Sequence, residues 1–184
     1  MTSAETKGMA KSGAIAGLCP ITEANLGDGI FNGSEFLEHG GAFGVGSDSN
    51  VNISLTEELR LLEYSQRLRD RERNVLAPAG GHTGETLYLG AAAGGAKALD
   101  RDAGRIATGA LADLVAIDST DAMLLGVNRN QLFDGLVFAA KDTVVTDVWS
   151  AGRHQVQSGR HIQQDKIAAL YRTAMGDLMS RLNQ

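Results

Sequence analysis

One carboxylate in this sequence stands where a buried strand runs directly into polar chain. Segment 42–46 (AFGVG) predicts a short apolar strand, and Ser47-Asp48-Ser49-Asn50 follows it at once. Open α/β sheets and β/α barrels bind their ligands at the carboxyl ends of parallel strands, so Asp48 is a candidate for ligand chemistry. The spacing equally allows Asp48 to cap its own loop or the next helix, and both interpretations stay open at this point.

A second group of polar residues follows another apolar segment. Residues 14–19 (AIAGLC) predict a strand buried on both faces, which Pro20 closes, and Glu23, Asn25 and Asp28 lie in the loop that we expect over 21–33. Such a loop could hold a polar substrate, although the same residue types also form ordinary turns. Cys19 has no histidine near it in sequence, so we interpret it as a small buried side chain rather than a nucleophile.

Other sites for chemistry lack the required spacing. The four histidines form no HxH or HxxxH pair, and we expect surface or turn positions for all of them: His39, His82, His154 and His161. The sequence contains neither a Walker loop nor a complete GxGxxG motif, so nucleotide binding has no support.

Composition narrows the class of protein. The 184 residues carry 17 Lys+Arg against 22 Asp+Glu, a net charge of -5, which disfavours nucleic-acid binding. A single cysteine cannot form an internal disulfide, no basic and apolar leader opens the chain, and no apolar run approaches the ~18 residues of a membrane span. We therefore expect a cytoplasmic protein with no membrane partner.

The elements that must position these residues follow from patterning. Thr2 and Glu5 have capping-box spacing and predict a helix over 4–11; a second helix over 34–39 lies between the two apolar strands. Strand, helix and strand in this order predict a parallel βαβ unit.

After the βαβ unit, the sequence pattern predicts two longer helices, and from Gly104 onward it predicts short β pieces. Ser54 and Glu57 predict a helix to about Asn74 whose charged side, with the pair Glu63 and Arg67 and the segment 67–73, faces solvent. An Ala/Gly-rich helix over 84–99 should lie close against a sheet. Short β pieces follow at 105–107, 113–118, 143–150 and 153–157, and an amphipathic helix over 164–182 ends the chain.

Three segments resemble a known family. Residues 19–31 (CPITEANLGDGIF) and 44–68 (GVGSDSNVNISLTEELRLLEYSQRL) closely resemble the C-terminal part of the formimidoylglutamate deiminases of the amidohydrolase superfamily. Residues 104–118 (GRIATGALADLVAID) resemble the return of that superfamily into its small β-sandwich. Related aminohydrolases share the Cys-Pro turn and the Ser-Asp after the last barrel strand, whereas the loop ITEANLGDGIF is specific to the deiminases.

The resemblance implies an α/β fold made of part of a metal-dependent (β/α)8 barrel. Residues 14–19 would be its seventh strand and 42–46 its eighth. The implied divisions are 1–103 for the barrel segment, 104–160 for the β-sandwich segment and 161–184 for the C-terminal amphipathic helix.

The resemblance also implies an activity: hydrolysis of N-formimino-L-glutamate to N-formyl-L-glutamate and ammonia, a step of histidine degradation, with one divalent metal that is usually zinc. Asp48 would ligate the metal and take a proton from the activated water. Glu23, Asn25 and Asp28 are the candidate substrate-binding residues on the grounds of their residue types and loop position given above. The family's histidine ligands, which belong to its first, fifth and sixth strands, have no counterparts in this sequence. We therefore expect the chain alone to be inactive, with an N-terminal half of the same enzyme or a further copy of itself as its partner.

Two alternatives remain. One is another aminohydrolase, acting on a guanine-like or triazine-like ring, although Glu23 and the loop Gly27-Asp28-Gly29 argue against it. The other is a non-catalytic interaction module in which residues 104–184 fold independently.

Overall fold

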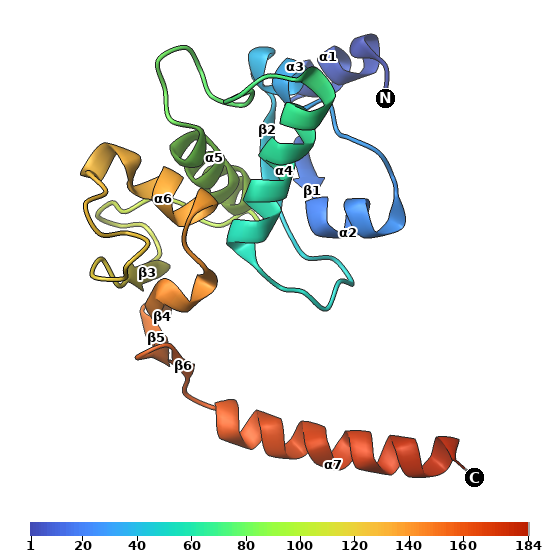
Figure 1. Cartoon of the computed structure of the whole chain (residues 1–184), viewed down its shortest axis with the longest axis vertical. Coiled ribbons are helices and arrows are strands. Elements are labelled where there is room, and N and C mark those ends of the chain that lie inside the picture. The colour runs from blue at the N-terminus through green and yellow to red at the C-terminus, as the bar shows by residue number, and fades with distance from the viewer. Residues whose placement is uncertain (184) are drawn as a thin grey trace.

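Two short parallel strands lie at the centre of the first half of the molecule (Figure 1). The computed structural model describes residues 1–183. Strand β1 (Ile15–Leu18) pairs in parallel with β2 (Ala42–Val45), with Ile15 opposite Ala42 and Leu18 opposite Val45. The predicted βαβ unit is therefore confirmed. Ala16 and Leu18 are buried but Gly17 is exposed, which corrects the expectation of a strand buried on both faces, because no described segment covers that face.

The connection from β1 to β2 contains two helices, where the sequence predicted one. Helix α3 (Gly33–Glu38) matches the expected helix, but α2 (Pro20–Leu26) lies in the segment predicted to be a loop. Pro20 occupies the first turn, where its fixed φ and missing N–H suit a helix, and Gly27 ends the helix at φ 77°. The Pro-to-Gly spacing was the signal that the loop interpretation missed.

Helix α1 (Ser3–Ser12) begins at the predicted capping box. The Thr2 hydroxyl accepts the Glu5 N–H, and the Glu5 carboxylate accepts the Thr2 N–H at 2.7 Å. Gly13, in the left-handed region, ends the helix directly before β1. Helix α1 packs on α3.

Helix α5 (Thr83–Ala98) lies against the sheet as the Ala/Gly-rich pattern predicted. The contact is backbone against backbone, because a methyl group placed on Gly94 would overlap the carbonyl oxygen of Phe43 in β2. Gly90 faces the ring of the same phenylalanine, where an added methyl would stand 3.0 Å from a ring carbon. The small residues of α5 therefore decide how closely helix and strand approach.

Helix α4 (Leu55–Asp70) begins at Ser54, whose hydroxyl accepts the Glu57 N–H at 3.1 Å. It ends at Asp70, short of the expected Asn74, because Arg71 adopts a left-handed conformation at φ 59°. The expected solvated charged side is also wrong in part. Glu63 is fully buried, binds the Arg67 guanidinium at 2.6 Å, and accepts two backbone N–H groups from the segment that follows the helix.

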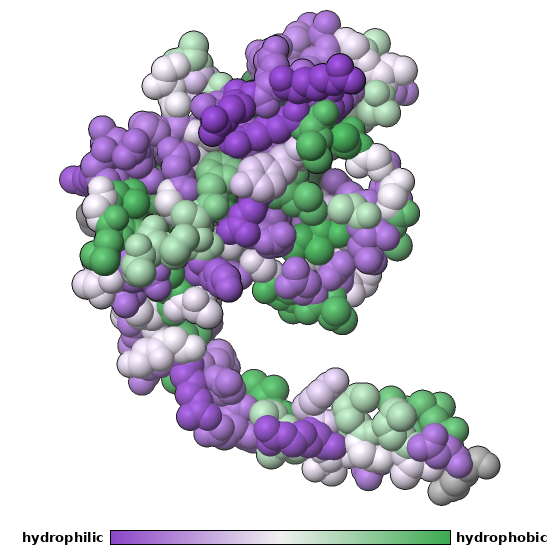
Figure 2. All heavy atoms as spheres, in the orientation of Figure 1, coloured by the Kyte–Doolittle hydropathy of each residue, from purple (hydrophilic) through white to green (hydrophobic). Residues whose placement is uncertain are grey.

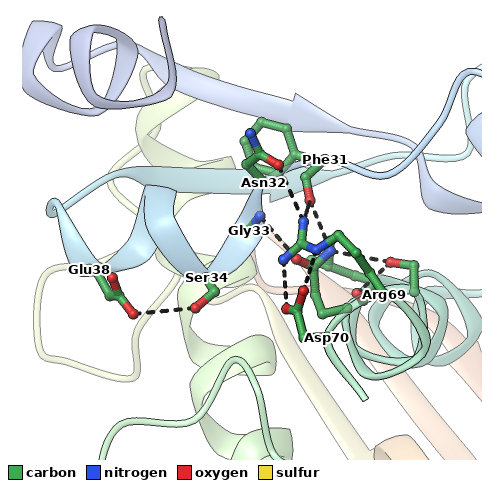
Figure 3. A network of polar contacts seen from close by, with 10 residues as sticks. Phe31, Asn32, Gly33, Ser34, Glu38, Arg69 and Asp70 are labelled. Atoms are coloured by element: carbon green, nitrogen blue, oxygen red, sulfur yellow. Dashed lines mark hydrogen bonds and ion pairs between the residues drawn. The ribbon is translucent and has the colours of Figure 1, made fainter. Parts of the chain in front are cut away.

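Arg69 likewise contributes to structure rather than to an open charged face. Its guanidinium donates to the Phe31 carbonyl and the Asn32 side chain and pairs with Asp70 (Figure 3). Gln66, one turn earlier in α4, accepts the Gly33 N–H and donates to the Phe31 carbonyl. These bonds hold the start of α3 against α4.

One core joins helices from both halves of the chain. Four fully buried side chains come from α3, α4, α5 and α6 (Leu132–Phe138): Phe36, Leu59, Leu87 and Val137. Arg60 of α4 reinforces this junction by donating to the Val137 and Ala140 carbonyls. Helix α6 therefore packs into the same core as the residues around the parallel strands.

The later β pieces form one antiparallel sheet of order β3-β4-β5-β6. Its strands are β3 (Leu114–Ile117), β4 (Val145–Ser150), β5 (Arg153–Gln157) and β6 (Arg160–His161), and 3-10 turns lie at Arg129–Gln131 and Asp142–Val144. Residues 105–107, predicted as a β piece, form no strand. Arg105 pairs locally with Asp102, and Ile106 is 90% exposed.

Helix α7 (Gln164–Leu182) has the predicted bounds but projects away from the rest of the molecule (Figure 1). No residue of α7 is buried, and an apolar stripe along it stays open to solvent (Figure 2): Ile167, Leu170, Tyr171, Leu178, Met179 and Leu182. Nothing in residues 1–183 covers this stripe. In that same part of the chain, no helix combines the length and the apolar character that crossing a membrane requires.

We predict opposite effects for two neighbouring glycines of α5. Gly94→Ala should lower the free energy of unfolding by about 1–3 kcal/mol, because the methyl overlaps the Phe43 backbone and forces helix and strand apart. Gly95→Ala meets no atom within 4 Å and should raise it by up to about 1 kcal/mol, because alanine is the better helix former. Urea denaturation of the two variants measures both effects. Equal stabilities would disprove the backbone contact.

Candidate active site

The parallel pairing brings two loops to the same edge of the sheet. Cys19 follows the last residue of β1, and Gly46-Ser47-Asp48 follows the last residue of β2. The Gly46 N–H donates to the Leu18 carbonyl at 3.0 Å, so the pairing continues one residue beyond the strands. This edge is where ligand sites form in sheets of this kind.

Asp48 lies exposed in a tight turn just past β2. It has φ 50°, and the Asn50 N–H closes the turn on the Ser47 carbonyl at 3.0 Å. Within residues 1–183, no hydrogen-bond donor reaches its carboxylate, and the cap of the following helix is Ser54. The helix-capping interpretation of Asp48 therefore does not hold, and its carboxylate is available to a ligand.

Glu23 is held close to the same edge. Its carboxylate accepts the Cys19 N–H at 2.8 Å and so caps the start of α2. It also borders a hollow of about 240 Å³ between α2 and α4, whose other polar member is Ser65. Asn25, on α2, and Asp28, just after Gly27, are both exposed. Of the three residues predicted to bind substrate, Glu23 alone has a side-chain bond to this edge among the described residues.

Three carboxylates lie close enough to Cys19 to affect its thiol. Burial raises the pKa of its thiol, and the negative charges of Asp48, Glu58 and Glu23 raise that pKa further. A raised pKa keeps the thiol protonated near neutral pH, whereas a nucleophilic cysteine needs the thiolate. The environment of Cys19 thus fits its interpretation as a small structural side chain, although it is half-buried rather than buried.

Glu58 is the residue at this edge that sequence reasoning missed. It is 2% exposed on the first turn of α4, and its Oε2 accepts the Ile21 N–H at 2.9 Å while Oε1 has no partner in the described chain. Burial raises the pKa of its carboxyl, the Ile21 N–H lowers it, and the charges of Glu23 and Glu57 raise it. A signal was present, because Glu58 stands four residues before Leu62 on the apolar side of α4.

The described residues do not form a metal site by themselves. In residues 1–183, no three histidine, cysteine, aspartate or glutamate side chains come together with a geometry that could hold a metal ion. Each histidine has its own hydrogen-bond partner away from the strand ends: His39 with the Glu35 carbonyl, His82 with Asp134, His154 with Asp147 and His161 with the Gln163 N–H. Asp48 is therefore the exposed carboxylate without a hydrogen-bond partner among residues 1–183 that directly follows β2.

Comparison with known proteins identifies the family. The family model "Amidohydrolase family" matches residues 2–154. The formimidoylglutamate deiminase of Pseudomonas aeruginosa is 48% identical over 180 residues, which are 96% of this chain and 39% of that protein. The 5-methylthioadenosine/S-adenosylhomocysteine deaminase of Pyrococcus abyssi is 31% identical over 77% of this chain and 32% of its own length.

Two solved structures resemble this chain in fold. An amidohydrolase from Brucella melitensis superposes with a TM-score of 0.89 at 50% identity, covering 97% of this chain and 39% of that one. An adenosine deaminase from Xanthomonas campestris with bound zinc superposes with a TM-score of 0.83 at 24% identity, covering 99% of this chain and 41% of the deaminase chain. At this identity the superposition is evidence for the fold alone. This chain spans about two fifths of the proteins that it matches. The predicted resemblance is confirmed, and this mixed α/β chain belongs to the amidohydrolase family.

Proposed function

We propose that this chain forms the C-terminal part of a formimidoylglutamate deiminase. The assembled enzyme hydrolyses N-formimino-L-glutamate: water adds to the formimino carbon, the bond from that carbon to its terminal nitrogen breaks, and N-formyl-L-glutamate and ammonia leave. The observation that carries this proposal is the 48% identity to a deiminase of that name over nearly the whole chain. In the same proposal, β1 and β2 are the last two strands of a (β/α)8 barrel.

Asp48 is the residue of this chain that we assign to the chemistry. Its exposed carboxylate has no donor among residues 1–183 and stands at the carboxyl end of a parallel strand. In the assembled enzyme its carboxylate would contribute one oxygen ligand to a divalent metal, and it would accept a proton from the attacking water and return that proton to the departing nitrogen. Such a metal, which is zinc in the solved adenosine deaminase named above, would supply the polarisation that makes water reactive at neutral pH.

The substrate-binding role of Glu23, Asn25 and Asp28 belongs to the same proposal. Asn25 and Asp28 are exposed, and the Asp28 carboxylate has the charge to attract the cationic formimino group. Glu23 contributes indirectly, by holding the backbone at the start of α2, because its carboxylate already accepts the Cys19 N–H.

The remaining metal ligands must come from polypeptide outside residues 1–184. A catalytic zinc takes three or more protein ligands, and the described chain presents one at the strand ends. The open stripe of α7 and an apolar hollow of about 500 Å³ between α5, β3 and α6 are surfaces that this polypeptide would cover. It is either the rest of a longer chain or a separate subunit.

We predict that residues 1–184 purified alone neither retain zinc nor release ammonia from N-formimino-L-glutamate. Mixing them with a separately produced polypeptide should restore both properties. That polypeptide is the part of the Pseudomonas aeruginosa relative outside the matched 39%. Zinc content after gel filtration and ammonia release are the measurements. Turnover by the isolated chain would contradict the requirement for outside ligands, and a zinc-loaded complex inactive on this substrate would contradict the proposed reaction.

A matched pair of variants tests Asp48 in the restored complex. Asp48→Asn should reduce ammonia release at least about 100-fold, because an amide can neither carry the proton nor ligate the metal as an anion. Asp100→Asn is the control, since Asp100 is also exposed and also has φ 50°. It should keep activity within twofold. Equal activities for the two variants would remove Asp48 from the mechanism.

A second candidate substrate class has one specific observation in its favour. The Pyrococcus abyssi relative, at 31% identity, is a deaminase of 5-methylthioadenosine and S-adenosylhomocysteine. An aminohydrolase acting on a ring would use Asp48 in the same way, because the reaction again replaces nitrogen by oxygen at an sp² carbon. Turnover by the restored complex of 5-methylthioadenosine, and not of N-formimino-L-glutamate, would favour this candidate.

A further inference from the structure

The loop that carries Asp48 is tied to α2 by one side-chain hydrogen bond. The Thr22 hydroxyl donates to the Ser47 carbonyl at 3.0 Å, and Thr22 is 6% exposed. The bonded carbonyl belongs to the peptide unit whose nitrogen is the amide of Asp48. A bond to this oxygen therefore fixes the plane from which the Asp48 side chain departs.

Asp48 needs such a restraint. A residue other than glycine at φ 50° occupies a sparsely populated region, which persists where the surroundings hold it in place. The Asn50 N–H closes the turn onto the same Ser47 carbonyl that Thr22 binds. This carbonyl thus has two donors, one from its own turn and one from α2.

Thr22 is itself held in place by α4. The N–H of Ile21, the residue before it, donates to Glu58 Oε2 at 2.9 Å, across 37 positions in sequence. Glu58 is almost completely buried, and its second oxygen has no partner in residues 1–183, so the bond to Ile21 is the one that this carboxylate makes there. A buried carboxylate with one bond is costly, which argues that its placement serves the neighbouring loop.

From this arrangement we propose that Thr22 is a positioning residue for Asp48 and that Glu58 acts through Thr22. Glu58 holds the first turn of α2, Thr22 extends from that turn to the Ser47 carbonyl, and the carbonyl sets the direction of the Asp48 carboxylate. The catalytic consequence rests on the proposed function, whereas the geometric consequence does not.

The chain offers a matched control for the loss of a buried hydroxyl. Thr6 is fully buried on α1, donates to the Thr2 carbonyl at 3.0 Å and accepts from Asn32. Thr6→Val therefore removes a buried threonine hydroxyl from a helix that packs on α3 rather than on the Asp48 loop. Thr22→Ser keeps the hydroxyl of Thr22, Thr22→Val removes it at nearly constant volume, and Thr22→Ala removes it without adding bulk.

The first experiment uses residues 1–184 labelled with ¹⁵N. The amide resonance of Asp48 should shift in Thr22→Val and in Thr22→Ala, because the preceding carbonyl loses its donor. It should stay at the wild-type position in Thr22→Ser and in Thr6→Val. An Asp48 amide resonance that keeps its wild-type position in Thr22→Val and Thr22→Ala would overturn the proposal, independently of the catalytic activity of the protein. The alanine variant keeps the test decisive if the valine variant does not fold.

The second experiment uses the complex restored with the remaining part of the Pseudomonas aeruginosa relative. Thr22→Val should lower kcat at least about tenfold with a smaller change in KM, because a misdirected Asp48 impairs the chemical step more than binding. Thr22→Ser and Thr6→Val should stay within twofold of wild type. A shifted Asp48 amide combined with an unchanged kcat would overturn the positioning role. An inactive wild-type complex would instead count against the proposed function, and the amide measurement would still decide the geometry.

Discussion

The backbone contact between Gly94 and Phe43 is the constraint on which the rest of the structure depends. Two parallel strands of four residues cannot stand alone in water, because parallel sheets need apolar cover and a two-stranded sheet buries little surface. Helix α5 provides that cover, and no side chain separates Gly94 from the Phe43 backbone at the point of closest approach. The orientation of β2, and with it the direction of the loop that carries Asp48, follows from this contact.

Three carboxylates near the ends of β1 and β2 have different environments. Glu23 is engaged by the Cys19 N–H, Glu58 is buried and bonded to the Ile21 N–H, and Asp48 is exposed without a donor in the described chain. Similar side chains therefore have different tasks: the first two organise α2, and the third is free for a ligand. Cys19 lies within the field of all three, which keeps its thiol protonated and removes it from consideration as a nucleophile.

The exposed apolar surfaces have a common explanation in the size of the relatives. The open stripe of α7 and the exposed face of β1 at Gly17 are unusual for a protein that folds and functions without a partner. The proteins that this chain matches are about two and a half times as long, since it covers 39% of the first of them. In the proposed function, polypeptide that corresponds to the unmatched parts of those proteins covers these surfaces, which is why the proposed activity is assigned to an assembly.

Local sequence was sufficient for many elements and for the family. Capping residues at Thr2 and Ser54, the parallel βαβ unit, the close-packing helix α5 and the bounds of α7 all follow from short-range patterns, because caps and periodicity act within a few residues. The motif around Asp48 likewise predicts a strand end for that residue, and β2 ends at Val45 shortly before it. Helix α2 was within reach too, since Pro20 and Gly27 mark its two ends.

Tertiary structure decided what happens to charged groups that look alike in sequence. Glu63 and Arg67 have the spacing of a surface pair, yet Glu63 is fully buried because the chain after α4 folds back and donates two N–H groups to it. Glu58 and Thr22 gain their roles from partners 37 and 25 positions away. The reason is physical: capping and periodicity are local, whereas burial and the direction of a hydrogen bond depend on which distant segments meet.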